Sequence, residues 1–285
     1  MRFFLGTHQV DWLAHAGVDL FVSRRRLFTR KGLPRAAAAW ALDSGGFTEL
    51  SMHGRWTVAP AQYVREVRRF RDEIGRLEWA APQDWMCEPV ITEKTGLTVE
   101  EHQRRTVDNF LELRALAPDL PFVPVVQGWS AWDYLRCVEL YDRAGVDLRA
   151  LPLVGVGTVC RRQGTLAGSN IFAQLAHEGL RMHGFGVKLT GLEAFGDKLA
   201  SSDSLAWSYS GRRDPPLPGH THKNCANCLE YALVWRSKIV AGDAPVPPSA
   251  NHGAQLGLFD APPANDAPSP SREVSGECVD PRAGR

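Results

Sequence analysis

The sequence predicts a parallel α/β fold, a (β/α)8 TIM barrel, from three observations. Short strand-like apolar runs occur eight times, and helical patterns stand between most of them. Alternating strands and helices favour a parallel sheet, and a count of eight suggests that the sheet closes into a barrel. Several runs also end in acidic, amide or glycine residues, and the active site of a barrel is built at that edge of the strands.

The predicted elements follow one another in regular order along the chain. The strand-like runs lie near residues 2–6, 19–23, 37–43, 77–83, 122–127, 153–157, 183–189 and 202–207. Helical patterns cover residues 60–75, 98–116, 130–144, 165–180 and 225–241. The run at 19–23 is the weakest, so seven strands and a loop remain an alternative. Thr98 and Glu101 have the spacing of a capping box, which indicates a helix start.

Length and composition fit one catalytic domain followed by a tail. The chain has 285 residues, of which 44% are hydrophobic, and a barrel takes roughly 250 residues. We assign residues 1–242 to the barrel, including a small metal-binding insertion at about 219–229. From about residue 243 the composition shifts to Pro, Ala, Ser, Asn and Asp, so we expect residues 243–285 to be disordered.

The sequence also predicts a cytoplasmic protein without a membrane partner. No apolar run approaches the roughly 20 residues that cross a bilayer, and the apolar start of the chain is too short for a secretory signal. The six cysteines are then expected to be reduced, buried or metal-bound.

Candidate site residues gather at the ends of the predicted strands. They are Asp43, Ser44 and Gly45 after the third run, Asp84 after the fourth, Gln127 at the fifth, Gly155 and Gly157 in the sixth and Asp203 in the eighth. A carboxylate can attack a sugar carbon or accept two hydrogen bonds from a purine edge, and glycines allow the backbone close to a flat ligand. The simpler alternative is that Asp43 caps backbone amides and that Asp203 caps a helix.

These motifs resemble a known superfamily in their order. The segments DSGGF, PQDWMCEP, VVQGW, VGVGT and SSDSLAWS, over roughly residues 1–242, are similar to the successive motifs of tRNA-guanine transglycosylases. The amino-acid sequences of these motifs resemble most those of the deazapurine DNA-modification (DpdA-type) transglycosylases. Two departures from the tRNA enzymes are Thr48, where they have glutamine, and a glycine motif that is reduced to Gly155 and Gly157.

The resemblance implies a role for each residue. Asp203 matches the nucleophile, Asp43 the second essential aspartate and Asp84 the acid that recognises the base. Gln127 and the backbone of Gly155 and Gly157 then contact the opposite edge of the base, and Ser44 and Gly45 line the pocket.

The function that follows is exchange of guanine in DNA for a 7-deazaguanine base through a covalent aspartyl-glycosyl intermediate. Exchange in tRNA is the first alternative. A base-excising N-glycosylase and a non-catalytic nucleic-acid-binding barrel are further alternatives.

The segment from His220 to Cys228 predicts a structural Zn²⁺ site. His220, His222, Cys225 and Cys228 supply borderline and soft ligands at the spacing that zinc prefers. The fourth ligand stays open, because one histidine could yield to a residue elsewhere, and a plain reduced pair of cysteines is the alternative.

Two further features suggest partners. The net charge is only +1, but Arg161, Arg162, Arg212 and Arg213 each follow a predicted active-site strand and could contact phosphates. In the tail, the segment from Gln255 to Phe259 resembles the short peptide with which bacterial replication proteins bind the sliding clamp. A chance match, or a segment that folds back on the barrel, is the alternative for these five residues.

Overall fold

The computed structural model describes residues 1–160, 162 and 165–241. The chain divides into two units, Met1–Pro248 and Ser249–Arg285, and every described residue belongs to the first. The predicted boundary at residue 242 and the disorder expected for residues 243–285 stay predictions, because residues 242–285 lie outside the described part.

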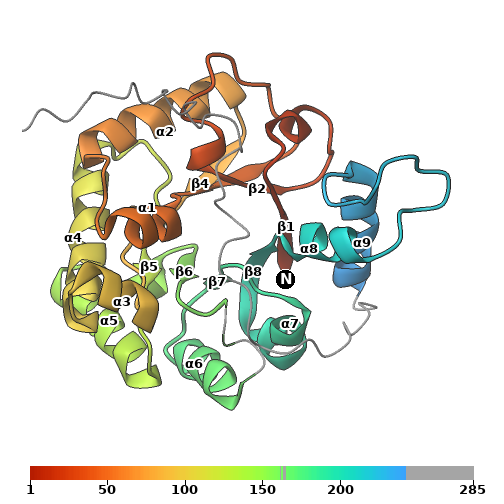
Figure 1. Cartoon of the computed structure of the whole chain (residues 1–285). Helices are drawn as coiled ribbons and strands as arrows, with labels where there is room; N and C mark the ends of the chain where they lie inside the picture. Colours follow the sequence, from red (N-terminus) through yellow and green to blue (C-terminus); the bar gives the residue numbers. More distant parts are fainter. Residues whose placement is uncertain (161, 163–164, 242–285) are drawn as a thin grey trace, which may run out of the picture. The chain divides into compact units, whose positions relative to one another are not determined.

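Eight parallel strands form the centre of the first unit, and the predicted (β/α)8 fold class is confirmed (Figure 1). They are β1 (Arg2–Thr7), β2 (Leu20–Ser23), β3 (Trp40–Asp43), β4 (Leu77–Ala80), β5 (Val125–Val126), β6 (Val154–Val156), β7 (Met182–Gly184) and β8 (Leu199–Ser204). Their order in the sheet is β4-β3-β2-β1-β8-β7-β6-β5. The weakest predicted strand, β2, pairs with both β1 and β3, which rules out the alternative of seven strands and a loop.

The two end strands of this sheet, β4 and β5, meet through an isolated parallel bridge. Ala80 pairs with Phe122, and the Val123 amide donates to the Ala80 carbonyl at 3.1 Å. Pro124 comes next and has no N–H to donate. The strand β5 therefore begins only at Val125 and has two residues, although the sequence predicts a run from 122 to 127.

Helices surround the strands (Figure 1). They are α1 (Gly46–His53), α2 (Pro60–Ile74), α3 (Pro89–Thr95), α4 (Val99–Leu116), α5 (Ala131–Arg143), α6 (Leu166–His177), α7 (Leu189–Phe195), α8 (Ala206–Arg213) and α9 (Leu229–Ala241). The sequence predicts α2, α4, α5, α6 and α9. It misses the four others, which have only seven or eight residues each and so carry too few turns for a helical pattern to show.

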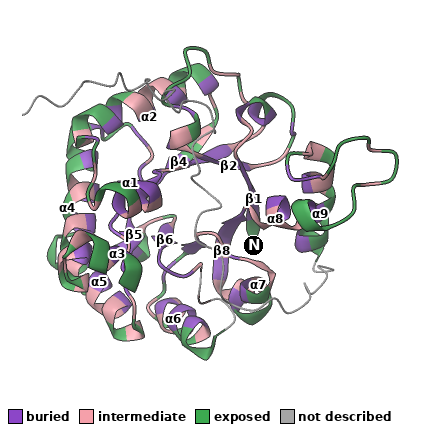
Figure 2. Ribbon diagram, viewed as in Figure 1, coloured by how far each residue is buried: buried purple, intermediate pink, exposed green. Residues whose placement is uncertain are grey.

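Alternate side chains of β1, β2 and β3 enter different cores. Phe3 and Leu5 of β1 belong to the main core with residues of the surrounding helices. Phe4, between them, belongs to a second cluster with Phe21 and Trp79. Because successive strand residues point to opposite faces, this second cluster fills the barrel interior. Figure 2 shows the strands as buried and the outer sides of the helices as exposed.

Candidate active site and metal centre

A chain of buried polar contacts links four of the strand ends. Asp84, in the loop after β4, accepts from the Ser44 hydroxyl through Oδ1 at 3.2 Å and from Nε2 of Gln127 through Oδ2 at 2.5 Å. The Thr158 hydroxyl, after β6, donates to Oε1 of Gln127 at 2.6 Å. Ser44, Asp84, Gln127 and Thr158 are all buried. The structure thus brings together three of the residues that the sequence predicts for substrate binding, and it adds Thr158.

The Asp84 carboxyl has an unusual affinity for protons. Burial, together with the negative charge of Asp43, raises its pKa to about 7, although the hydrogen bonds from Gln127 and Ser44 oppose this shift. The influence of Asp43 on Asp84 shows that these two predicted acids lie near each other. A carboxyl with a pKa near neutrality in a buried site is typical of functional sites.

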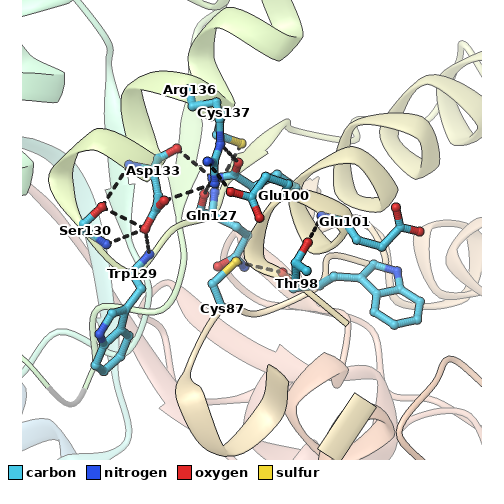
Figure 3. A network of polar contacts seen from close by, with 12 residues as sticks. Cys87, Thr98, Glu100, Glu101, Gln127, Trp129, Ser130, Asp133, Arg136 and Cys137 are labelled. Atoms are coloured by element: carbon cyan, nitrogen blue, oxygen red, sulfur yellow. Dashed lines mark hydrogen bonds and ion pairs between the residues drawn. The ribbon is translucent and has the colours of Figure 1, made fainter. Parts of the chain in front are cut away.

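The backbone of Gln127 is fixed by the helices behind β5. Gln103 of α4 donates from Nε2 to the Gln127 carbonyl and to the Asp133 carbonyl, both at 2.6 Å. Asp133 completes a capping box with Ser130 at the start of α5 and also accepts from the Trp129 amide at 3.1 Å (Figure 3). The backbone of Gln127 is therefore held in place by contacts with two helices.

At α4 the predicted capping box is only half formed. Oγ1 of Thr98 accepts from the Glu101 amide at 3.2 Å (Figure 3). The Glu101 carboxylate pairs with Arg104 and Arg105 on the same helix, both at 2.7 Å.

Gly155 in β6 and Gly157 directly after it make room for neighbouring side chains. A Cβ on Gly157 would lie 2.2 Å from Nε2 of Gln127, and a Cβ on Gly155 would lie 2.6 Å from the Phe185 ring. Their N–H groups donate to the carbonyls of Val126 and Pro124 in the sheet. The space that the sequence predicts beside this strand is thus filled by protein side chains, and contact of the two glycines with a base stays a prediction.

Thr158 combines a strained backbone with a central position in the site. Its φ of +58° lies in the left-handed region, which is rare for a β-branched residue. Its Oγ1 accepts from the Cys87 amide at 2.9 Å in addition to contacting Gln127. Such strain costs about 1–3 kcal/mol and is found mainly at functional sites. The sequence offers no local signal for this role beyond the position of Thr158 after Gly157.

Asp203 points into the barrel from β8. Its Oδ1 accepts from the Gly186 amide at 2.9 Å and lies 3.2 Å from Nε2 of His183 on β7. The alternative role of Asp203 as a helix cap is ruled out, since α8 begins after Leu205 without a side-chain cap. Sequence reasoning missed His183, because its partner is twenty residues away along the chain.

Three of the four predicted phosphate-binding arginines lie in the described part. The Arg162 guanidinium stacks 4.4 Å from the ring centre of Trp129 and donates to the Trp129 carbonyl. Arg213 stacks 3.4 Å from the ring centre of Tyr209, and Arg212 beside it is exposed. Arg161 lies outside the described residues, as does the segment from Gln255 to Phe259. The contact of these arginines with phosphate stays a prediction.

The predicted ligands His220, His222, Cys225 and Cys228 form one cluster, whose ligand atoms all lie within 4.8 Å of one another. Nε2 of His222 lies 3.3 Å from Nδ1 of His220 and 3.1 Å from Sγ of Cys225. Tetrahedral zinc with two nitrogen and two sulfur ligands separates them by roughly 3.3–3.8 Å. The four residues therefore fit a metal ion, and both histidines take part in the cluster.

A carboxylate and the barrel support this cluster. Nε2 of His220 faces Glu230 at 3.0 Å, which leaves Nδ1 directed at the cluster. The Cys225 amide donates to the Gly211 carbonyl at 2.8 Å, and Asn227 contacts His8 after β1 at 2.5 Å. The metal-binding loop is thus attached both to α8, which follows Asp203, and to the end of the first strand.

The fold and the site define a (β/α)8 barrel protein with buried carboxylates at the strand ends. The chain matches the family described as DpdA, DeoxyPurine in DNA protein A, over residues 1–272. It belongs to this family.

Two solved structures show a weak likeness to this chain. A candidate isomerase from Sinorhizobium meliloti is 10% identical, with a TM-score of 0.39 over 71% of this chain. Pyruvate carboxylase from Rhizobium etli with acetyl coenzyme A is 12% identical, with a TM-score of 0.36 over 81% of this chain. The chain spans 50% of the first protein and 26% of the second. A search of curated proteins found no match.

None of the helices in the described part is both long and apolar enough to cross a membrane.

Proposed function

We propose that this protein exchanges guanine in DNA for a 7-deazaguanine base through a covalent bond between Asp203 and the deoxyribose. Membership of the DpdA family supports DNA as the substrate. The observation that carries the proposal is the buried network of Asp84, Gln127 and Ser44. It offers carboxylate, amide and hydroxyl groups that match the donors and the carbonyl of a guanine edge.

The reaction has two balanced halves. In the first, an oxygen of Asp203 bonds to C1′ while the C1′–N9 bond of guanine breaks, and the leaving base takes up a proton at N9. In the second, the incoming base gives up its N9 proton and bonds to C1′ while the ester to Asp203 breaks. We assign this proton to Asp43, which holds it before the first half, while Asp84 is ionised, and regains it in the second.

Base recognition requires the network to open. In the structure the Gln127 amide donates to Asp84. A guanine edge would replace this donor with its N1–H and exocyclic amine at Asp84, and would accept from the freed amide at its carbonyl. Ser44 and Gly45 line the same pocket in this proposal. The exchange of partners keeps the buried polar groups satisfied in both states.

The cluster of His220, His222, Cys225 and Cys228 would hold Zn²⁺ in a structural role. All four positions of a tetrahedral site are filled by the protein, so no position is left for a substrate or an activated water. Bound zinc would hold the loop between α8 and α9.

A target base inside a duplex must leave the stack before Asp203 can reach C1′. We assign Arg161, Arg162, Arg212 and Arg213 to the flanking phosphates.

Gln255 to Phe259 would bind the sliding clamp, which a fluorescence-polarisation titration of a peptide of residues 251–263 tests. Equal binding by a peptide with Leu258 and Phe259 changed to Ala would contradict it.

The deciding experiment measures exchange of labelled guanine on duplex DNA and on unmodified tRNA in parallel, with and without a 7-deazaguanine base. We expect incorporation into DNA that Asp203→Asn and Asp43→Asn each reduce at least 10³-fold. Asp108→Asn, on the outer helix α4, serves as the control and should keep the wild-type rate.

Other outcomes would each support one alternative. Exchange on tRNA alone would indicate the tRNA enzyme, and guanine release with abasic DNA would indicate an N-glycosylase. Nucleic-acid binding that is unchanged by substitution of Asp43, Asp84 and Asp203, without any exchange, would indicate a binding barrel.

A further inference from the structure

A fully buried histidine stands at the centre of the barrel. His183 of β7 has 0% exposure. Four aromatic rings surround it, with centroids 4.6 Å (Trp79), 4.9 Å (Phe185), 5.7 Å (Phe21) and 6.0 Å (Phe4) from the imidazole. Burying a polar imidazole among apolar rings costs free energy unless its nitrogens are hydrogen-bonded, so its polar partners are informative.

Both ring nitrogens of His183 have a polar partner on β8. Nδ1 lies 2.8 Å from Oγ of Ser201, and Nε2 lies 3.2 Å from Oδ1 of Asp203. An ionised carboxylate only accepts, so Nε2 must be the donor in this pair. In a neutral imidazole Nδ1 is then an acceptor, and the Ser201 hydroxyl donates to it. The Asp203 carboxylate thereby fixes which nitrogen carries the proton, and the Ser201 hydroxyl satisfies the other nitrogen.

The contacts of Asp203 are uneven between its two oxygens. Within the described residues, the hydrogen bonds to this carboxylate come from His183 and from the Gly186 amide, and both end at Oδ1. Two donors on one oxygen fix the rotation of the carboxylate and leave Oδ2 available for reaction. The residue pairs in register with Phe4 of the neighbouring strand, which fixes its backbone as well.

We infer that His183 is a positioning residue for the Asp203 nucleophile, held in the Nε2–H form by Asp203 with Ser201 donating to Nδ1. This inference rests on the proposed function, since it assigns His183 a part in the same displacement at C1′. The imidazole donates to Oδ1 and orients the carboxylate, so that Oδ2 faces the anomeric carbon. The aromatic cage keeps water away from the imidazole.

The first test compares His183→Phe, which fills the cage but removes the donor, with His183→Gln, whose amide can still donate to Asp203. We expect His183→Phe to lower kcat for base exchange and the rate of covalent protein–DNA adduct formation about 100-fold. The KM for DNA should stay unchanged, because an interaction made only at the reacting centre leaves binding intact. His183→Gln should recover about a tenth of the wild-type rate.

Phe21→Leu is the matched control, because it alters the cage but keeps the histidine and both of its hydrogen bonds. If His183→Phe fails to fold, Ser201→Ala takes its place and should lower kcat about tenfold. A wild-type kcat in His183→Phe, or an equal loss in Phe21→Leu, would overturn the inference. Absence of exchange and adduct in the wild-type protein would instead contradict the proposed function.

A second measurement is independent of catalysis. Nitrogen-15 NMR of histidine-labelled protein without DNA distinguishes the two tautomers and the imidazolium. The signal of His183, identified by its loss in His183→Gln, should show a protonated Nε2 and an unprotonated Nδ1. A proton on Nδ1 would contradict the assigned hydrogen-bond directions and the role of Ser201.

Discussion

The Gln127 amide donates a 2.5 Å hydrogen bond to Oδ2 of Asp84, which precedes it by 43 residues in the chain. This contact favours the charged carboxylate, while burial and Asp43 favour the protonated form and leave the pKa at about 7. Asp84 therefore changes its charge within the neutral range. Any function that needs its carboxylate must depend on pH there.

The first prediction concerns recognition of the base. If ionised Asp84 accepts from the base, the KM for the incoming 7-deazaguanine should fall as pH rises from 6 to 8, through the pKa of about 7. Below that pKa, each unit by which the pH falls should raise KM up to about tenfold. Steady-state exchange at saturating DNA measures it. Asp84→Asn is the control, and a parallel pH dependence of KM in this variant would contradict the assignment.

The second prediction concerns stability. The folded protein holds the Asp84 proton more tightly than the unfolded chain, whose pKa is close to 3.8. The contribution of this group to the free energy of unfolding is thus most favourable below pH 4 and is lost as pH rises to 7. We expect wild type to lose about 2–3 kcal/mol relative to Asp84→Asn between pH 5 and pH 8. Urea unfolding of both proteins checks this, and parallel curves would speak against a raised pKa.

The third prediction tests the fit of Gln127 against β6. Gly157→Ala places a methyl group 2.2 Å from the Gln127 amide, which must displace the amide from Asp84. We expect base exchange to fall at least tenfold and stability to fall by about 1–3 kcal/mol. Gly32→Ala is the control, because its Cβ would meet nothing within 4 Å. Unchanged exchange in Gly157→Ala would show that the Gln127 position is not needed.

The fourth prediction concerns the metal. Elemental analysis should find about one zinc per chain, and a chelator should lower the melting temperature, because ligand binding and folding are coupled. Cys225→Ser with Cys228→Ser should abolish metal binding, whereas Cys160→Ser, outside the cluster, should keep it. Glu230→Gln should weaken affinity about 10–100-fold, since it removes the partner of the His220 ring. A metal-free protein of unchanged melting temperature would rule out the structural site.

The fifth prediction concerns the arginines of α8. Arg212→Gln with Arg213→Gln should reduce the slope of log K for DNA against log salt by about 0.9 for each lost phosphate contact. Arg143→Gln, an exposed arginine on α5, should leave the slope unchanged. Equal slopes for the double variant and wild type would exclude a phosphate role for this pair.

Local patterns in the sequence predict much of this molecule. Strand-end acids and the amide of Gln127 stand out because each follows an apolar run, and the metal ligands lie within nine residues of one another. The shortening of β5 by Pro124 is also readable in retrospect, since proline cannot donate to a sheet.

The remaining features depend on contacts between distant parts of the chain. In the sequence His183 is one polar residue in a predicted strand, and its partners become visible only when β8 pairs with β7 in the fold. Gly155 and Gly157 signal empty space, but the sequence does not show that Phe185 and Gln127 fill it. Glu230 reads as an ordinary acid at a helix start, and only the fold places it behind His220.

The placement of β1 between β2 and β8 has a consequence for how the protein is made. During synthesis β1 leaves the ribosome before β8, so one of its edges stays unpaired until β8 follows, because Phe4 pairs with Asp203. Such non-local closure slows folding, and an open strand edge invites pairing with other chains. Arg236 and Trp235 of α9 also contact Phe3, so they cover β1 only after that closure. The nascent barrel is therefore most exposed to aggregation just before the strand that carries Asp203 joins it.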